Sequence, residues 1–256
     1  MSLQYSDTTN KNGLVQEVER ELGLDYAVIS GNTTKLKEVT VAINRALDDY
    51  TALALRASGT WQFDDSNHTD FPIIKTNLVD GQRSYIFTSD EGGNLILDIH
   101  KVLVLPSATA TLYEEIYPID QQTKDNGGDI VTESTSEGVP FTYDKTANGI
   151  FLDPIPSYNA TNGLKLLINR EASYFTTSDT TKKPGIPGIH HEYLVIKAAY
   201  KFARRKGLAI QANLLAEVIK YEGSEERRVS GKIQEYFGKR NRDEVHQITP
   251  KLKQYV

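Results

Sequence analysis

The hydrophobic pattern changes its period twice along this 256-residue chain. Near both ends, apolar residues recur every three or four positions, as they do along the buried side of an α-helix. From residue 61 to about residue 177, short β-branched and aromatic runs alternate with turns that contain Gly and Asn, which is typical of strands. This order predicts an α+β protein in which helices from both ends flank a continuous block of strands.

The N-terminal segment predicts two helices. The first, residues 14–22, is short and stops at Gly23. The second, residues 34–57, follows capping oxygens and carries an apolar stripe in steps of three and four. Residues 1–12 are polar and have no period, so we expect a loose arm there.

The C-terminal segment predicts two more helices and a tail. One helix covers residues 190–206 and is ended by Gly207. The other covers residues 210–237, and Gly223 is expected to bend or break it. Residues 240–256 are basic, contain a proline and lack any period, so they are expected to form an extended tail.

The central block predicts short strands closed by Asn-Gly and other turn pairs, with a hairpin around Asn148–Gly149. No helical pattern separates the strands, so an antiparallel β-sandwich or barrel-like domain is expected. Residues 120–138 are polar and Gly-rich, which indicates a long exposed loop. The expected strands are residues 61–63, 73–76, 84–88, 95–105, 111–116, 141–145, 149–153 and 164–170.

Neither pair of helices buries its apolar stripe well alone. The economical arrangement packs both pairs together as a bundle with the β block inserted. We therefore expect residues 1–60 and 185–256 to form a discontinuous helical bundle domain with a C-terminal tail. Residues 61–184 are expected to form the inserted β domain.

The search for catalytic or metal-binding chemistry is negative. The chain has no cysteine, which excludes disulfides, thiolate metal sites and cysteine nucleophiles. His190, His191 and Glu192 are adjacent, and neighbouring residues on a helix point about 100° apart, so they are interpreted as polar residues of a first helical turn. Asp98 and His100 are interpreted as a surface pair. No nucleophile elbow, dinucleotide fingerprint or phosphate-binding loop is present. We expect no enzyme activity, no catalytic residues, no metal site and no cofactor.

Composition limits the partners. No apolar run approaches the roughly 20 residues that a membrane span needs, so no membrane is expected as a partner. The net charge of −5 argues against a general nucleic-acid binder. Residues 201–256 nevertheless carry 13 Lys and Arg against 7 Asp and Glu, a local excess of +6 that leaves −11 for the rest. Two interpretations stay open: solvated faces of opposite sign, or surfaces that meet positive to negative.

Two stretches together resemble a known family. The first runs from Phe141 and Tyr143 through the Gly149–Asp153 strand to a Pro-Ile-Pro turn, and continues into residues 164–170 and Phe175. The second runs from Lys183 through a Pro- and Gly-bearing linker into the helix that opens at His190. This pattern, together with the helix–strand–helix order, resembles the head–tail adaptor proteins of tailed bacteriophages, including the tail tubular protein A group of short-tailed phages.

The resemblance implies a structural virion protein of the phage neck. It implies a homo-oligomeric ring of about twelve copies below the portal protein, synthesised in the bacterial host cytoplasm. DNA would pass through a central channel without sequence-specific binding. The helical bundles would contact the portal, and the β domains would meet the downstream tail or nozzle protein.

The C-terminal tail is the candidate partner-binding segment. Apolar residues contribute little to a tail that stays in solvent, whereas a segment that orders on a partner buries them as anchors. The basic residues of the tail would steer its approach to that partner. The alternative is a tail that packs on its own bundle. The candidate residues are Arg240, Arg242, Val245, Ile248, Leu252, Tyr255 and Val256.

Three other functions stay open. The chain could be another neck or tail component of the same virion, or an enzyme with a dispersed site. It could also be a carbohydrate-binding or adhesin-like β module, because tyrosines, unusually numerous here, offer stacking faces. Those faces would come from Trp61, Tyr85, Tyr113, Tyr117 and Tyr143.

Overall fold

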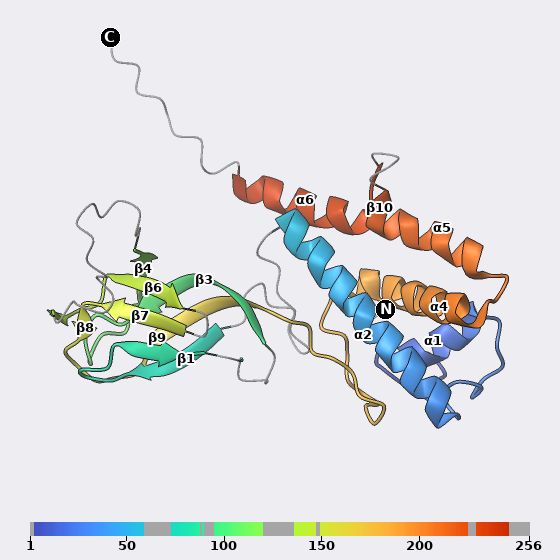
Figure 1. Ribbon diagram of the computed structural model, residues 1–256, viewed down its shortest axis with the longest axis horizontal. Coiled ribbons are helices and arrows are strands. Elements are labelled where there is room, and N and C mark those ends of the chain that lie inside the picture. The colour runs from blue at the N-terminus through green and yellow to red at the C-terminus, as the bar shows by residue number, and fades with distance from the viewer. Residues whose placement is uncertain are drawn as a thin grey trace, which may run out of the picture. The chain divides into compact units, whose positions relative to one another are not determined.

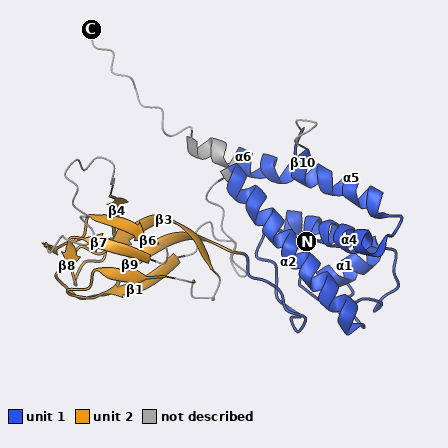
Figure 2. Ribbon diagram, viewed as in Figure 1, with its two compact units in different colours: residues 1–69, 172–256 blue, residues 70–171 orange. Residues whose placement is uncertain are grey.

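The computed structural model describes residues 3–58, 73–87, 89, 95–119, 136–146, 149–224 and 229–245, with the side chains of 58, 229 and 239–245 left out. The chain is a mixed α+β protein, as the sequence predicts. It divides into two compact units, drawn in two colours in Figure 2. We call Met1–Thr69 with Ala172–Val256 the helical unit, and Asp70–Glu171 the sheet unit.

The helices of the described residues match the expected ones closely at the N-terminal side and less well at the C-terminal end (Figure 1). The break expected near Gly223 is confirmed, because that glycine has φ +84 and starts a short hairpin between two helices. The helical elements are α1 Leu14–Glu21, α2 Thr33–Ser58, the 3-10 turn η2 Gly188–His190, α4 His191–Lys206, α5 Gln211–Glu222 and α6 Lys232–Val245, and the hairpin is β10 Gly223–Ser224 with β11 Val229–Ser230.

The extended tail expected from residue 240 is wrong in its first part. The last helix, α6, continues through Val245. Its final residues, Lys-Arg-Asn-Arg-Asp-Glu-Val, include no Pro or Gly, so they can propagate a helix without an apolar stripe. A search for apolar period does not detect such a turn.

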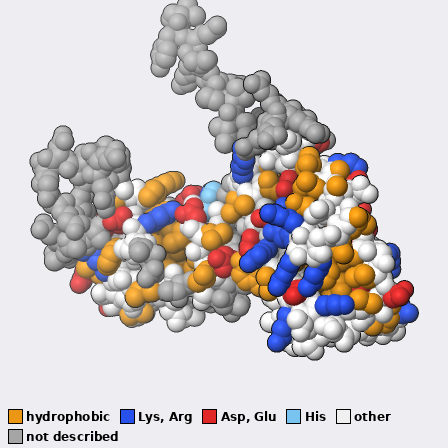
Figure 3. Space-filling model, turned by 45° about the vertical axis from the view of Figure 1, so that its right-hand side comes forward, with side chains coloured by type: hydrophobic (Ala, Val, Ile, Leu, Met, Phe, Trp, Pro, Cys, Tyr) orange, Lys and Arg blue, Asp and Glu red, His pale blue; other side chains and the backbone are white. Residues whose placement is uncertain are grey.

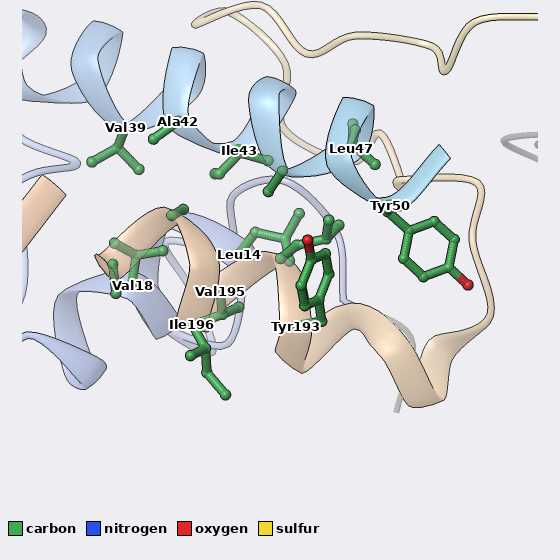
Figure 4. Close-up of a cluster of buried hydrophobic side chains, with 14 of the residues drawn as sticks. Leu14, Val18, Val39, Ala42, Ile43, Leu47, Tyr50, Tyr193, Val195 and Ile196 are labelled. Carbon is green, nitrogen blue, oxygen red and sulfur yellow. The ribbon is translucent and has the colours of Figure 1, made fainter. Parts of the chain in front are cut away.

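The core of the helical unit forms around α4, which packs against α1, α2 and α5. Helix α2 also packs against α6. In Figure 4 the apolar stripe of α2 faces α1 and α4, so residues from both ends of the chain share one core. Fully burying each such side chain contributes roughly 1.5–3 kcal/mol. Core side chains with 0% exposure include Leu14, Val18, Val39, Ile43, Leu47, Tyr50 and Tyr193.

The N-terminal arm is bound, and not loose as expected. Tyr5 is 0% exposed, and its ring stacks on Phe175 with 5.0 Å between centroids. Its hydroxyl lies 2.5 Å from Thr40 Oγ1, and its backbone N–H donates to the Lys182 carbonyl at 2.7 Å. One buried aromatic ring and these hydrogen bonds hold a segment whose composition is polar.

The segment expected to be a linker before α4 is part of the helical core. Ile186 of the expected linker, residues 180–188, is buried there, and Ser6 N–H donates to the Thr180 carbonyl. Ala172 and Phe175, which were expected in the β domain, are buried in the same core. The helical unit therefore starts again at Ala172, whereas the sequence assigned residues up to 184 to the β domain.

The sheet unit is one curled seven-stranded sheet, a half-barrel, and not a sandwich of two sheets. Its order is β1-β9-β3-β4-β6-β7-β2. A purely antiparallel sheet was expected, but β4 and β6 run parallel, with Tyr117 opposite Thr142. The strands are β1 Ile73–Leu78, β2 Ser84–Ile86, β3 Ile96–Val104, β4 Glu114–Pro118, β6 Thr142–Thr146, β7 Gly149–Asp153 and β9 Ala160–Arg170, and a separate pair joins β5 Glu137–Gly138 to β8 Ile155–Pro156.

Alternation along the strands places one apolar face in the core of the sheet unit. The expected hairpin is confirmed, with β6 and β7 paired so that Asp144 lies opposite Phe151. The strand expected at residues 111–116 lies instead at Glu114–Pro118. The strand expected at residues 61–63, and residues 120–135 of the expected loop, lie outside the described residues.

Candidate functional site

The tail residues proposed as a binding segment lie largely outside the described residues. The backbones of Arg240, Arg242 and Val245 belong to α6, but their side chains are not described. The other four, Ile248, Leu252, Tyr255 and Val256, lie outside the described residues altogether. Binding by this segment therefore stays a prediction.

The adjacent histidines before α4 stabilise the fold individually. His190 is 3% exposed, and its Nδ1 lies 2.6 Å from the Tyr50 hydroxyl. His191 is 1% exposed, accepts a hydrogen bond from the Leu3 N–H at Nδ1 and contacts the Ile186 carbonyl through Nε2. The two rings thus tie α4 to α2 and to the N-terminal arm. They are buried, which their polar character did not predict.

The environment of His190 disfavours its charged form. Burial lowers the pKa of its imidazole to about 4, and the neighbouring His191 adds to this effect. A neutral imidazole can share one hydrogen bond with the Tyr50 hydroxyl, as donor or as acceptor, and no charge is then buried. Burial also raises the pKa of the Tyr50 hydroxyl well above its usual value, so both groups stay neutral at pH 7.

The neighbouring carboxylates of Asp48 and Asp49 bind different partners. Asp48 accepts a hydrogen bond of 2.6 Å from the Tyr174 hydroxyl. Asp49, which points about 100° away from Asp48 on α2, pairs with Lys197 at 3.3 Å and with Lys201 at 3.0 Å. The two carboxylates do not face each other, so they do not form an acid/base pair across a cleft. In the sheet unit, Asp98 pairs with Lys145 at 3.0 Å.

The densest polar arrangement of the helical unit lies where α2, α4 and α5 meet. Lys197 of α4 is held between Asp49 of α2 and Glu222 at the end of α5. Glu222 also accepts a hydrogen bond of 2.7 Å from the Tyr193 hydroxyl. We call these residues, with Lys201, the three-helix seam. Figure 3 shows Lys and Arg side chains gathered over the helical unit, with acidic and hydrophobic side chains between them.

A second tyrosine continues the seam. The Tyr221 hydroxyl of α5 donates to Glu192 of α4 at 2.7 Å, and its ring lies 5.8 Å from that of Tyr193. Burial, followed by the nearby carboxylates, raises the pKa of both phenols. Both therefore stay protonated and donate, so they fix the angle between α4 and α5 and are not proton-transfer groups at pH 7.

An open pocket of about 270 Å³ adjoins the seam and is lined by Asp49, Ala52, Leu53, Arg56, Lys197 and Glu222. Its carboxylates already pair with Lys197, so the pocket is electrostatically close to balanced. No nucleophile hydrogen-bonded to a general base lines it. The seam was not predicted, because Asp49, Lys197 and Glu222 are far apart in sequence and each also suits a solvated helix face.

Among the described residues, no group of three His, Asp or Glu side chains is placed to hold a metal ion. Within the same part of the chain, no helix is both long and apolar enough to cross a bilayer. No protein-family model matches the chain, and no curated protein matches it significantly.

Of the four described rings expected to bind sugars, only Tyr117 is largely exposed to solvent. Tyr85 and Tyr143 are 5% and 3% exposed, because both point into the sheet core. Tyr113 is covered by the Lys165 ammonium, 5.2 Å from its ring centroid. Tyr117 is 64% exposed, and Trp61 lies outside the described residues. The four described rings therefore do not form a shared stacking platform for a sugar.

Proposed function

We propose that this chain is a structural virion protein, a head–tail adaptor that forms a ring of about twelve copies between portal and tail. In this proposal the helical unit acts as a bundle domain that contacts the portal. The sheet unit meets the downstream tail or nozzle protein, and DNA passes through the centre without sequence-specific binding. The protein would be made in the host cytoplasm and act in the neck of the virion.

The observation that carries the proposal is the insertion of one unit into the other. Helices from both chain ends share one core, and residues 70–171 form a separate sheet unit between them. Two units on one chain can each contact a different neighbour, which a linker between two rings requires. The resemblance around Gly149–Asp153 and the linker before α4 supports the same assignment.

The described polar groups also favour assembly over catalysis. The three-helix seam consists of ion pairs and of a hydrogen bond that the Tyr193 hydroxyl donates, and these contacts join helices. Its carboxylates are thus already paired with lysines. The histidines bind structural partners. We therefore propose a non-enzymatic role without a cofactor. Another neck or tail component of the same virion is the nearest alternative.

A carbohydrate-binding module is the alternative from another class, and one observation keeps it testable. Tyr117 is exposed on β4, and Phe141 beside it is 61% exposed. Their backbones are joined, since Tyr117 N–H donates to the Phe141 carbonyl at 3.3 Å. Each of these exposed aromatic rings offers a face on which a sugar could stack.

The test of the adaptor proposal is a mass measurement of the purified chain, alone and after mixing with a portal ring. We expect a discrete complex that contains about twelve copies per portal ring. A chain that never binds the portal ring, but binds defined glycans on an array through Tyr117, would replace the adaptor proposal with the carbohydrate-binding one.

A further inference from the structure

The two units carry net charges of opposite sign. The helical unit has 22 Lys and Arg against 19 Asp and Glu, a net charge of +3. The sheet unit has 7 Lys and Arg against 15 Asp and Glu, a net charge of −8. The value of −5 for the whole chain therefore averages a basic unit with an acidic one, and Figure 3 shows Lys and Arg side chains gathered over the helical unit. A polyanion would be attracted to the helical unit and repelled by the sheet unit.

Helix α4 carries a stripe of basic side chains. Its members are Lys197, Lys201, Arg204 and Arg205, and Lys206 follows as the last residue of the helix. The first four are at positions i, i+4, i+7 and i+8, so they share one side of the helix. The three C-terminal cations are exposed and the two lysines before them are partly exposed. Like charges one turn apart repel each other, so the stripe disfavours the helix unless anions lie nearby.

The carboxylates beside the stripe neutralise only part of its charge. Two of them belong to α2, and each is shared between two cations. The distances are 3.0 and 3.5 Å from Glu38 to Lys206 and Arg205, and 3.0 and 3.3 Å from Asp49 to Lys201 and Lys197. Glu222 of α5 is the third carboxylate and also pairs with Lys197. Five cations of α4 are thus matched by three carboxylates.

Arg45 of α2 adds a sixth cation to the same surface. It is exposed, and it follows Glu38 by seven residues and precedes Asp49 by four, so the helical period puts all three on one side of α2. That side borders the stripe, because both carboxylates reach cations of α4. Six cations and three carboxylates leave a surplus of three positive charges. We call the six cations the basic face: Arg45, Lys197, Lys201, Arg204, Arg205 and Lys206.

Helix stability accounts for only part of the basic face. Cations in the last turn of a helix interact favourably with its dipole, which explains the basic residues at positions 204–206. Lys197 and Lys201 lie before the last turn, where that effect has fallen off. The cores of protein–protein interfaces are depleted in lysine, whereas protein–DNA interfaces are strongly positive because Lys and Arg neutralise phosphates. The composition of the face therefore favours a phosphate backbone over an acidic protein surface.

We propose that the basic face binds the phosphate backbone of duplex DNA without reading its sequence. From Glu38 to Asp49 the face extends about 17 Å along α2, the length of about five base pairs. Contacts of Lys and Arg with phosphates position DNA and carry no sequence information. The inference rests on the proposed function, in which DNA passes the subunit, and it names the surface that contacts the DNA. A single subunit suffices for this contact.

The test measures binding of the full-length chain to a labelled duplex of about 20 base pairs by fluorescence anisotropy. We expect a Kd of about 10⁻⁴–10⁻⁶ M at physiological salt, and equal affinity for a second duplex of unrelated sequence. If the four exposed cations of the face each neutralise one phosphate, affinity should fall about 150-fold when salt rises from about 50 to about 200 mM.

Two matched double variants locate the contact. Arg204→Gln with Arg205→Gln should weaken binding at least about tenfold at low salt and should lower the salt slope by about two, because two phosphate contacts are lost. Arg20→Gln with Lys220→Gln removes two exposed cations of α1 and α5 outside the face, and should change neither quantity. Arg204→Lys with Arg205→Lys keeps both charges and should keep the slope. Circular dichroism checks that each variant is folded.

Two results would overturn the inference: a folded wild-type chain that does not bind the duplex at about 50 mM salt, or equal loss of binding in the two Gln variants. Binding to a portal ring is measured separately with the same proteins. Loss of portal binding in the Arg204–Arg205 variant, with no DNA binding by wild type, would assign the face to an acidic protein partner instead. DNA binding through the face without any portal binding would contradict the adaptor function and leave this inference standing.

Discussion

The two units of this protein differ in which chain segments form their cores and in where polar side chains are buried. The sheet unit is one continuous segment, and beside its apolar core the polar side chains of Asn169 and Arg170 are buried near the end of β9. The helical unit joins segments from both chain ends, and among its described residues six polar or charged side chains are buried besides its apolar core. These are Gln16, Glu19, Thr40, Thr51, His190 and His191.

The buried polar groups of the helical unit lie where distant segments meet. Tyr5 bonds Thr40, Tyr50 bonds His190, and Leu3 N–H bonds His191, which is 188 positions away. Glu19 accepts N–H groups of Ile29 and Ser30 at 2.7 Å. Apolar packing is not directional, so a unit closed by remote segments gains its register from hydrogen bonds. In the sheet unit, the strand ladder sets register.

The largest expected effect comes from a charge in the helical core. Ile43→Asp places a carboxylate on the buried stripe of α2 and should destabilise the helical unit by more than about 4 kcal/mol. Because the sheet unit has its own core, its strand amides should stay protected in hydrogen exchange while α2 and α4 lose protection. Val41→Asp, at a position on the same helix that is 50% exposed, is the control and should cost little. Simultaneous loss of protection in both units would show that they do not fold separately.

The reciprocal change in the sheet unit should be somewhat smaller. Leu166 is 0% exposed on β9, and Leu166→Ala should destabilise the sheet unit by about 2–5 kcal/mol through lost contacts and a cavity. Thermal unfolding followed by strand and helix signals should show an early sheet transition and an unchanged helical one. Leu97→Ala, at a position 48% exposed, should leave both in place.

Acid should weaken the helical unit through His190. The pKa of this imidazole is about 4 in the folded chain and about 6.5 when unfolded, so the unfolded state binds its proton first as pH falls. Its stabilising contribution is complete above about pH 6.5 and is lost between pH 6.5 and pH 4, which removes about 3 kcal/mol. The melting temperature of the helical unit, measured across this range, should fall less steeply in His190→Gln. Equal slopes in the two proteins would rule out His190 as the cause.

The smallest effect on stability is expected from the tail, although its effect on assembly should be large. Removing residues 246–256, which are proposed to order on a partner, should change the free energy of unfolding of the helical unit by less than about 1 kcal/mol. Attachment to portal-bearing heads should be lost, because the tail's apolar residues are proposed to order on a partner. A truncated chain that melts early and still attaches would show instead that the tail packs on its own unit.

Local pattern determined much of the fold. The stripe of α2, the stop after α4 at Gly207 and the break at Gly223 follow from period and glycine placement, and each is found within a residue or two. The β6–β7 hairpin likewise follows from its Asn-Gly turn. These features depend on neighbours within about ten positions, which is the range over which a single sequence is informative.

The tertiary structure decided what joins distant positions. The N-terminal arm and the segment after Ala172 appear polar or irregular in sequence, yet they bind each other. The Tyr5 ring stacks on Phe175, and the backbone N–H groups of Tyr5 and Ser6 donate to carbonyls of that segment. The parallel β4–β6 pair and the ion pairs of Lys197 also depend on segments that sequence period does not connect. A pattern specifies which side of an element is apolar. Only packing specifies which remote element covers it, because burial and pairing energies arise from the partner as well as the residue.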